Sequence, residues 1–240
     1  MCIRDRRNRY WSKQQDEDLL RGQKGEDSVI IMGNSYGIDL IYALKENGSK
    51  LNITFLSTTS FCSNFGTIPN DNEQIKKCLE IKKGNFAHKK WKTIDRIYLY
   101  DNWIVFDLGK LKNSLAEIRT LSDVPIFVFG PKMDYAKQIP DIVKRHMHMR
   151  SINDFSQKFQ NKYRIEQNNQ LKTMLANGFY ADNNIYYVDM ISSQCGEDVK
   201  GCKIISNENQ KFLFFDDGHF TKEGAYQFGK KLKKEYPELF

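Results

Sequence analysis

The sequence predicts an α/β domain in which one mostly parallel sheet has helices on both faces. Three observations support this class. Short apolar runs of strand length recur along the chain, amphipathic stretches of helix length separate them, and 240 residues are enough for one sizeable core. Strands that alternate with helices indicate a parallel sheet, because parallel strands need a crossover between them. We therefore expect a single three-layer α/β/α domain.

The first half of the chain contains three expected strands and two expected helices. Residues 28–32 (SVIIM) are a continuous apolar run of the buried-strand type. Residues 38–47 place their Ile and Leu side chains on one helical face, and residues 51–56 (LNITFL) alternate as a strand does. A loop with Cys, Asn, Gly and Pro leads to a helical stretch near 71–83, and residues 95–100 (DRIYLY) form the third strand.

The second half continues the alternation. Residues 108–121 form an amphipathic helix with a stripe of Leu and Ile, and residues 124–130 (VPIFVFG) form a strand that ends at Gly-Pro. A loop bounded by prolines follows, and then one long helical segment over about 153–176. Residues 184–190 (NIYYVDM) are the fifth strand, and the last helix begins at about Thr221.

The N-terminal segment differs from the rest of the chain. Residues 1–26 are rich in charge and lack the apolar stretch of a signal peptide. No uninterrupted apolar run approaches the roughly 18–20 residues that a membrane-spanning helix needs. We expect a linker or foreign extension over residues 1–26 and one domain over residues 27–240.

The net charge of +7 comes from 37 basic and 30 acidic residues. A basic balance can indicate a nucleic-acid partner. Here the lysines are scattered over the expected helix faces and the C-terminal tail, without a nucleic-acid motif. We therefore expect no nucleic acid as a partner, and steeply salt-dependent DNA binding would overturn that expectation.

Four of the five cysteines fall into two local couples. Cys62 and Cys78 bracket a loop with Gly, Pro and Asn, and Cys195 and Cys202 bracket a short polar loop. Two loop-closing couples favour disulfides and an oxidising compartment, whereas the alternative is four free thiols in the cytosol. Neither couple has the C-x-x-C spacing of a zinc site, and we expect no metal.

Ser35 follows the first expected strand and stands at the start of the first expected helix. In open parallel sheets, sites lie at the carboxyl ends of the strands. Unpaired backbone N–H groups at a helix N-terminus favour a negative charge, so Ser35 is a candidate nucleophile whose own N–H can stabilise an oxyanion. A serine at this place is also typical of a helix N-cap, and both interpretations stay open.

Asp216 and His219 lie in the segment D-D-G-H, just before the last expected helix. A histidine can take the proton of a serine hydroxyl and return it to a leaving group. A carboxylate three residues earlier on a turn can reach the other ring nitrogen and fix the tautomer. The alternative is a solvated polar turn in which Thr221 caps the last helix.

A serine after the first strand, combined with D-x-x-H before the last helix, resembles the SGNH/GDSL hydrolase superfamily. The stretch G-N-S stands where the family usually has G-D-S, and D-D-G-H with F-T-K-E-G-A resembles its last block. The resemblance implies a flavodoxin-like fold with Ser35 as nucleophile, His219 as base and Asp216 behind it. Asn102, in Y-D-N-W, falls where the family places an oxyanion-hole asparagine.

The departures from the family pattern fall in its first three blocks. Asn34 replaces the usual acidic residue, and Asp101 in Y-D-N-W competes for the role of local organiser. The second-block glycine has no clear match. We expect the remaining oxyanion amide in the loop after the second strand, near Ser60 or at Gly66.

The cysteine couples and Trp103 after the third strand resemble one branch, the periplasmic SGNH domains fused to bacterial membrane acyltransferases of the acyltransferase 3 type. This resemblance implies transfer of an acyl group from a donor to hydroxyls of cell-surface polysaccharide, without a cofactor. It also implies an extracytoplasmic location, an acyltransferase membrane domain in the same or a neighbouring chain, and a place in the C-terminal part of a longer protein.

Two other functions remain open at this point. One is a carbohydrate O-acetyl esterase with the same three residues, which differs from the transferase only in the acceptor that attacks the acyl-enzyme. The other is a catalytically silent carbohydrate-binding domain that has kept the fold, for which the changes at Asn34 and at the third block leave room.

Overall fold

The computed structural model describes residues 26–58, 62, 72–103, 107–146 and 151–240. They form one five-stranded sheet in the order β2-β1-β3-β4-β5, and every neighbouring pair is parallel. The predicted α/β class and its five strands are therefore confirmed. The strands are β1 (Ser28–Gly33), β2 (Asn52–Ser57), β3 (Arg96–Tyr100), β4 (Ile126–Phe129) and β5 (Ile185–Val188).

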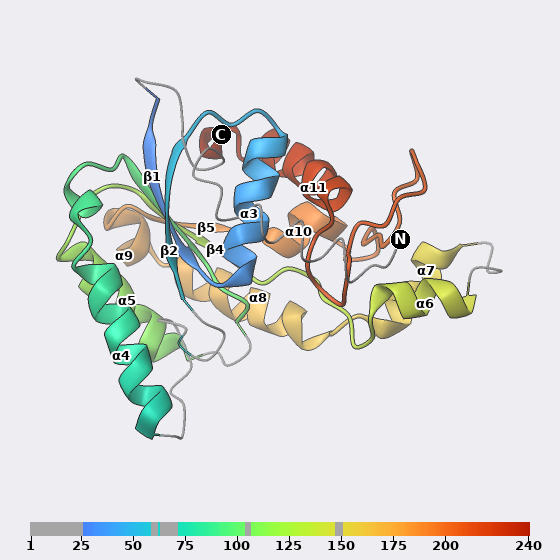
Figure 1. Ribbon diagram of the computed structural model, residues 1–240, viewed down its shortest axis with the longest axis horizontal. Helices are drawn as coiled ribbons and strands as arrows, with labels where there is room; N and C mark the ends of the chain where they lie inside the picture. Colours follow the sequence, from blue (N-terminus) through green and yellow to red (C-terminus); the bar gives the residue numbers. More distant parts are fainter. Residues whose placement is uncertain (1–25, 59–61, 63–71, 104–106, 147–150) are drawn as a thin grey trace.

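Helices cover both faces of this sheet, with α3 and α11 on one side and α4 and α5 on the other (Figure 1). No helix in the described ranges is long and apolar enough to cross a membrane. The helices are α3 (Ser35–Glu46), α4 (Asn72–Phe86), α5 (Leu108–Arg119), α6 (Ile139–His146), α7 (Ile152–Ser156), α8 (Tyr163–Leu175), α9 (Gly178–Asp182), α10 (Met190–Cys195) and α11 (Lys222–Glu235), with 3-10 turns η2 (Lys89–Lys92), η3 (Gln157–Phe159) and η4 (Pro237–Leu239).

Two apolar cores result from the alternation of side chains along the strands. In β1, Val29 and Ile31 pack with α3 and α11, whereas Ile30 and Met32 pack with α5 and α8. All four side chains are fully buried. A strand that is covered on both faces needs apolar residues at consecutive positions, which explains the uninterrupted run in the sequence.

The strand order creates a switch point between β1 and β3. From β1 the chain crosses to β2 on one side, while β3, β4 and β5 follow on the other side. A Cβ atom on Gly33, the last residue of β1, would lie 1.8 Å from the carbonyl oxygen of Tyr100, so this position excludes any side chain. The ends of β1 and β3 therefore run close together, where open α/β sheets bind ligands.

The single helix predicted over residues 153–176 is wrong. The chain forms α7, η3 and α8 instead, and it is extended at Gln160. Gln160 pairs with Tyr135 in an antiparallel bridge, and Ala136 N–H donates to the Phe159 carbonyl at 2.7 Å. The loop after β4 thus forms hydrogen bonds with backbone groups that a continuous helix would use for its own hydrogen bonds. That loop also contains α6, which was not predicted from the sequence.

Both predicted disulfides are present. Cys62–Cys78 ties the segment after β2 to α4, and Cys195–Cys202 closes the loop after α10. A disulfide typically stabilises a fold by about 2–4 kcal/mol, mainly by constraining the unfolded chain. The predicted boundary at residue 26 stays a prediction, because residues 1–25 lie outside the described part of the chain.

Candidate active site

Ser35 is the first residue of α3 and is half-buried. The N-cap is Asn34, whose Oδ1 accepts a hydrogen bond from Tyr36 N–H at 3.0 Å. Asn34 thus provides the capping interaction that was the alternative role of Ser35. The Ser35 N–H lies ahead of the first intrahelical hydrogen bond, where a helix offers donors to an anion.

The imidazole of His219 lies between Ser35 and Asp216. Its Nε2 is 2.8 Å from Ser35 Oγ, and its Nδ1 is 2.8 Å from Asp216 Oδ2. If the proton of the neutral ring is on Nδ1, that nitrogen donates to the carboxylate and Nε2 accepts from the serine hydroxyl. The structure therefore brings together three residues that the sequence placed up to 184 positions apart.

Asp216 is held in place by the turn that it begins. Its Oδ1 accepts hydrogen bonds from the N–H groups of Gly218 at 2.9 Å and of His219 at 2.7 Å. Burial raises the pKa of this carboxyl, but the hydrogen bond and charge of His219 and the two backbone donors outweigh burial and lower the pKa to about 2. Asp216 is therefore ionised at neutral pH.

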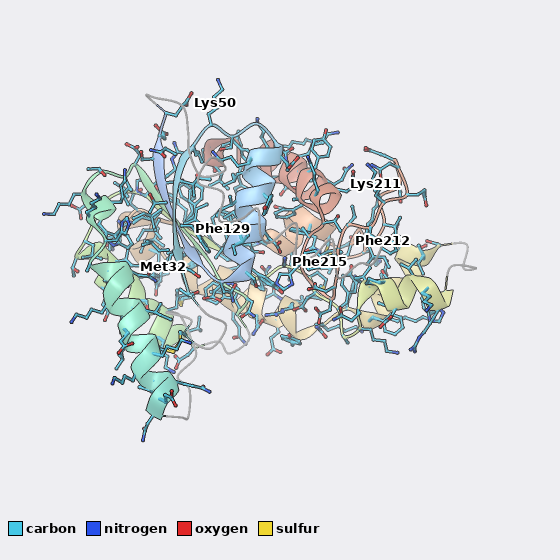
Figure 2. The ribbon with its side chains drawn as sticks, viewed as in Figure 1. Met32, Lys50, Phe129, Lys211, Phe212 and Phe215 are labelled. Atoms are coloured by element: carbon cyan, nitrogen blue, oxygen red, sulfur yellow. A yellow bond between two sulfur atoms is a disulfide. The ribbon has the colours of Figure 1, made fainter. Side chains whose placement is uncertain are left out.

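Aromatic side chains fix the imidazole ring from two sides. Phe215 stacks on His219 with ring centroids 5.6 Å apart and 12° between the planes. Tyr36 meets the same ring edge-on at 5.7 Å and 80°. Figure 2 labels Phe215 at the end of the sheet opposite Lys50, which precedes β2. These contacts restrict rotation of the ring away from Ser35.

A buried carboxylate and guanidinium lie behind Tyr36. The Tyr36 hydroxyl donates to Asp134 Oδ2 at 3.3 Å, and Arg164 donates to the same oxygen through Nε at 3.0 Å and Nη2 at 2.6 Å. Burial and the charge of Asp134 raise the pKa of Tyr36 well above its usual range, so the phenol is neutral. Neither charged residue was predicted from the sequence. Asp134 follows β4 at the carboxyl edge, which was the signal available, whereas Arg164 gave none.

Asn102 lies at the end of β3 and is half-buried. Its backbone is fixed by two neighbours, because Arg164 Nη1 donates to its carbonyl at 2.5 Å and its N–H donates to Asp101 Oδ1 at 2.8 Å. Asp101 is fully buried, and its Oδ2 accepts from the Thr58 hydroxyl at 3.2 Å, beyond β2. Asp101 therefore organises this edge, and the oxyanion role of the Asn102 side chain stays a prediction.

The remaining site predictions concern the last oxyanion amide and a metal ion. Ser60 and Gly66, the two candidates for the remaining oxyanion amide, lie outside the described residues and stay predictions. In the part of the chain that is described, no three His, Cys, Asp or Glu side chains form a group that could hold a metal ion.

A half-buried serine that starts the first helix, and a His-Asp turn before the last helix of a parallel sheet, are the features of an SGNH-class domain. The sequence model of the family described as "SGNH domain (fused to AT3 domains)" matches residues 1–234. The chain belongs to this family, which confirms the predicted resemblance. At family level, membership indicates acyl transfer or hydrolysis by an enzyme of the SGNH class.

The structure is also similar to the periplasmic domain of a lipopolysaccharide acetyltransferase from Salmonella ser. Paratyphi A. The TM-score is 0.73, the alignment covers 97% of each chain, and the sequence identity is 15%. At this identity the likeness shows the fold alone. No curated protein matches the chain.

Proposed function

We propose that this chain is the SGNH domain of an O-acyltransferase, which passes an acetyl group through an acyl-serine at Ser35 to hydroxyls of a cell-surface polysaccharide. One observation carries the proposal. The Ser35 hydroxyl, the His219 ring and the Asp216 carboxylate form a continuous hydrogen-bonded series with both contacts at 2.8 Å. Such a series activates a hydroxyl that is a poor nucleophile at its ordinary pKa.

In the first half-reaction, Ser35 Oγ attacks the carbonyl carbon of an acyl ester or thioester while its proton moves to His219 Nε2. The carbonyl oxygen becomes an oxyanion in a tetrahedral intermediate. When the intermediate collapses, the bond to the leaving oxygen or sulfur breaks, and His219 returns the proton to that atom. The acyl group remains on Ser35, and Asp216 stabilises the imidazolium between the two proton transfers.

In the second half-reaction, a sugar hydroxyl attacks the acyl-serine and gives its proton to His219. Collapse releases the acylated sugar, and the proton returns to Ser35 Oγ. Water in place of the sugar hydroxyl gives hydrolysis, with the same residues in the same roles. Transfer and esterase activity therefore differ in the acceptor that is bound, and not in the serine chemistry.

Three donors are proposed for the oxyanion. They are the Ser35 N–H at the start of α3, the Asn102 side chain at the end of β3 and an amide in the loop after β2. Tyr36 N–H is not among them, because it donates to the Asn34 cap. Donors of this kind act where charge develops and need no rearrangement during the reaction.

Transfer rather than hydrolysis is supported by the family, whose SGNH domains are fused to AT3 domains, and by the fold shared with a domain of a lipopolysaccharide acetyltransferase. The two disulfides favour an oxidising compartment. The proposal accordingly has the domain outside the cytoplasm, beside an AT3 membrane domain in the same or a neighbouring chain. That domain would deliver the acyl donor.

The first experiment is labelling with a fluorophosphonate probe, followed by peptide mass spectrometry. We expect the probe on Ser35 and no labelling of the Ser35→Ala variant. A folded wild-type protein that does not label would refute the serine chemistry and favour the silent carbohydrate-binding domain.

A second experiment separates the O-acyltransferase from the O-acetyl esterase. The protein is incubated with an acetyl donor and a bacterial surface glycan. Transfer adds about 42 Da to the glycan for each acetyl group, whereas hydrolysis releases only acetate.

A further inference from the structure

Lys132 and Asp39 form an ion pair that is enclosed by the protein. Lys132 lies in the loop after β4, Asp39 lies on α3, and their side chains are 0% and 1% exposed. The Lys132 ammonium bonds to Asp39 Oδ2. Removing two charges from water is so costly that such a pair is weak evidence for stability, and apolar residues of similar volume often serve as well. A role other than stability therefore has to be considered.

The contacts of the ammonium suggest that role. Lys132 Nζ lies 4.0 Å from the ring centroid of Tyr36 and 4.3 Å from that of Phe220. Asp39 Oδ2 accepts a hydrogen bond from Phe220 N–H at 3.4 Å. Tyr36 directly follows Ser35, and Phe220 directly follows His219. The ion pair thus contacts the neighbour of the proposed nucleophile and the neighbour of the proposed base.

We infer that Lys132 and Asp39 are positioning residues that hold the Ser35 and His219 segments at hydrogen-bonding distance. The inference rests on the proposed serine mechanism. The two segments come from opposite ends of the domain, so their spacing depends on what lies between them. A cation close to two aromatic rings is attracted to both, and the Asp39 carboxylate holds the ammonium in place. Reactive groups displaced by about 1 Å can lose about a hundredfold in rate.

The two charges of the pair also stabilise each other. Burial lowers the pKa of Lys132, and the adjacent Asp39 carboxylate opposes that shift. Burial raises the pKa of Asp39, and the charges of Lys132 and then of His219 oppose it. Each charge is therefore stabilised by its partner, and replacing only one residue leaves the other ionisable group unpaired in the interior.

The test uses the double variant Lys132→Met/Asp39→Asn. Methionine keeps an unbranched side chain, and asparagine keeps an acceptor for Phe220 N–H, so both charges disappear together. With 4-nitrophenyl acetate as the probe substrate, we expect kcat to fall about ten- to a hundredfold while KM changes by less than about twofold. The rate of fluorophosphonate labelling at Ser35 should fall in parallel, with a thermal midpoint close to that of the wild type.

The matched control is Arg96→Met/Asp27→Asn, which removes an ion pair at the opposite edge of the sheet, where the side chains are 20% and 50% exposed. Its kcat should equal that of the wild type. If the Lys132/Asp39 variant does not fold, Lys132→Met/Asp39→Leu takes its place with the same expected loss of kcat.

A folded variant with wild-type kcat and labelling rate would overturn the positioning role. That result is distinct from failure of the proposed function, which would appear as a wild-type protein that neither labels at Ser35 nor turns over the ester.

Discussion

The two edges of the sheet use charge in different ways. At the amino edge, Arg96 and Asp27 pair on the surface with exposed fractions of 20% and 50%. At the carboxyl edge, Lys132 pairs with Asp39 at 0% and 1%, and Arg164 pairs with Asp134 at 2% and 11%. Surface pairs contribute little to stability, whereas buried pairs carry a desolvation cost.

The desolvation cost of buried charge is concentrated at the carboxyl edge. The buried charges gather around the Ser35–His219 contact, and they connect the ends of β3 and β4 to α3 and α8. Apolar residues could fill the same volume, so we interpret the carboxyl edge as built for the geometry of a site. The ion pair at the amino edge is interpreted as an ordinary partly exposed pair that contributes little to stability. Substitutions that remove both charges of a buried pair at the carboxyl edge should therefore change rates more than stability.

The largest effect is expected for Ser35→Ala. Without the hydroxyl no acyl-enzyme forms, and turnover of 4-nitrophenyl acetate should fall by about 10⁴–10⁶-fold. Intact-mass spectrometry after a short incubation should show the acyl adduct on the wild type alone. The matched control is Ser122→Ala, in the turn after α5, and its turnover should not change. Turnover in Ser35→Ala equal to that of Ser122→Ala would mean that the chemistry does not use Ser35.

The next largest effect is expected for Asp216→Asn. The amide would keep the shape of the side chain but favour the wrong tautomer of His219, and kcat should fall on the order of 10³–10⁴-fold. Steady-state kinetics beside thermal unfolding would separate this loss from a folding defect. A decrease of less than tenfold would show that the carboxylate does not orient the imidazole.

Asn102→Ala is expected to have an intermediate effect. Loss of one oxyanion donor typically lowers kcat by about 10²–10³-fold, and KM should change little. The backbone contacts of Asn102 with Arg164 and Asp101 do not require its side chain, so the variant should fold. Wild-type kcat in this variant would remove Asn102 from the oxyanion hole and leave only backbone donors.

The smallest effect concerns stability against pH. The pKa of Asp216 is about 2 in the folded state and 3.8 in its ordinary state, so its contribution is present above about pH 4 and is lost as pH falls toward 2. The shift corresponds to about 2 kcal/mol. Urea unfolding at pH 6 and at pH 2.5 should show a larger loss for the wild type than for Asp216→Asn. Equal losses in the two proteins would mean that Asp216 contributes nothing to the dependence of stability on pH.

The site residues predicted from the sequence are marked by neighbours close to them in the chain, whereas those that were not predicted depend on partners far away in the chain. Ser35 was selected because it follows an apolar strand and precedes a helix, and His219 because it stands in a short motif before another helix. Both signals are local. Asp39 is flanked by apolar residues in α3, yet its partner Lys132 is 93 residues away and nothing nearby in the sequence pairs them.

Periodicity and short motifs were enough to predict the α/β class, the five strands, the family and the residues to inspect at the carboxyl edge, because these patterns reflect local geometry and burial. Three features could be seen only in the folded chain: Asn34 rather than Ser35 caps α3, the helix predicted over 153–176 breaks at Gln160, and Lys132 lies between Tyr36 and Phe220. Each of these depends on contacts between segments far apart along the chain, whose energies no local pattern contains.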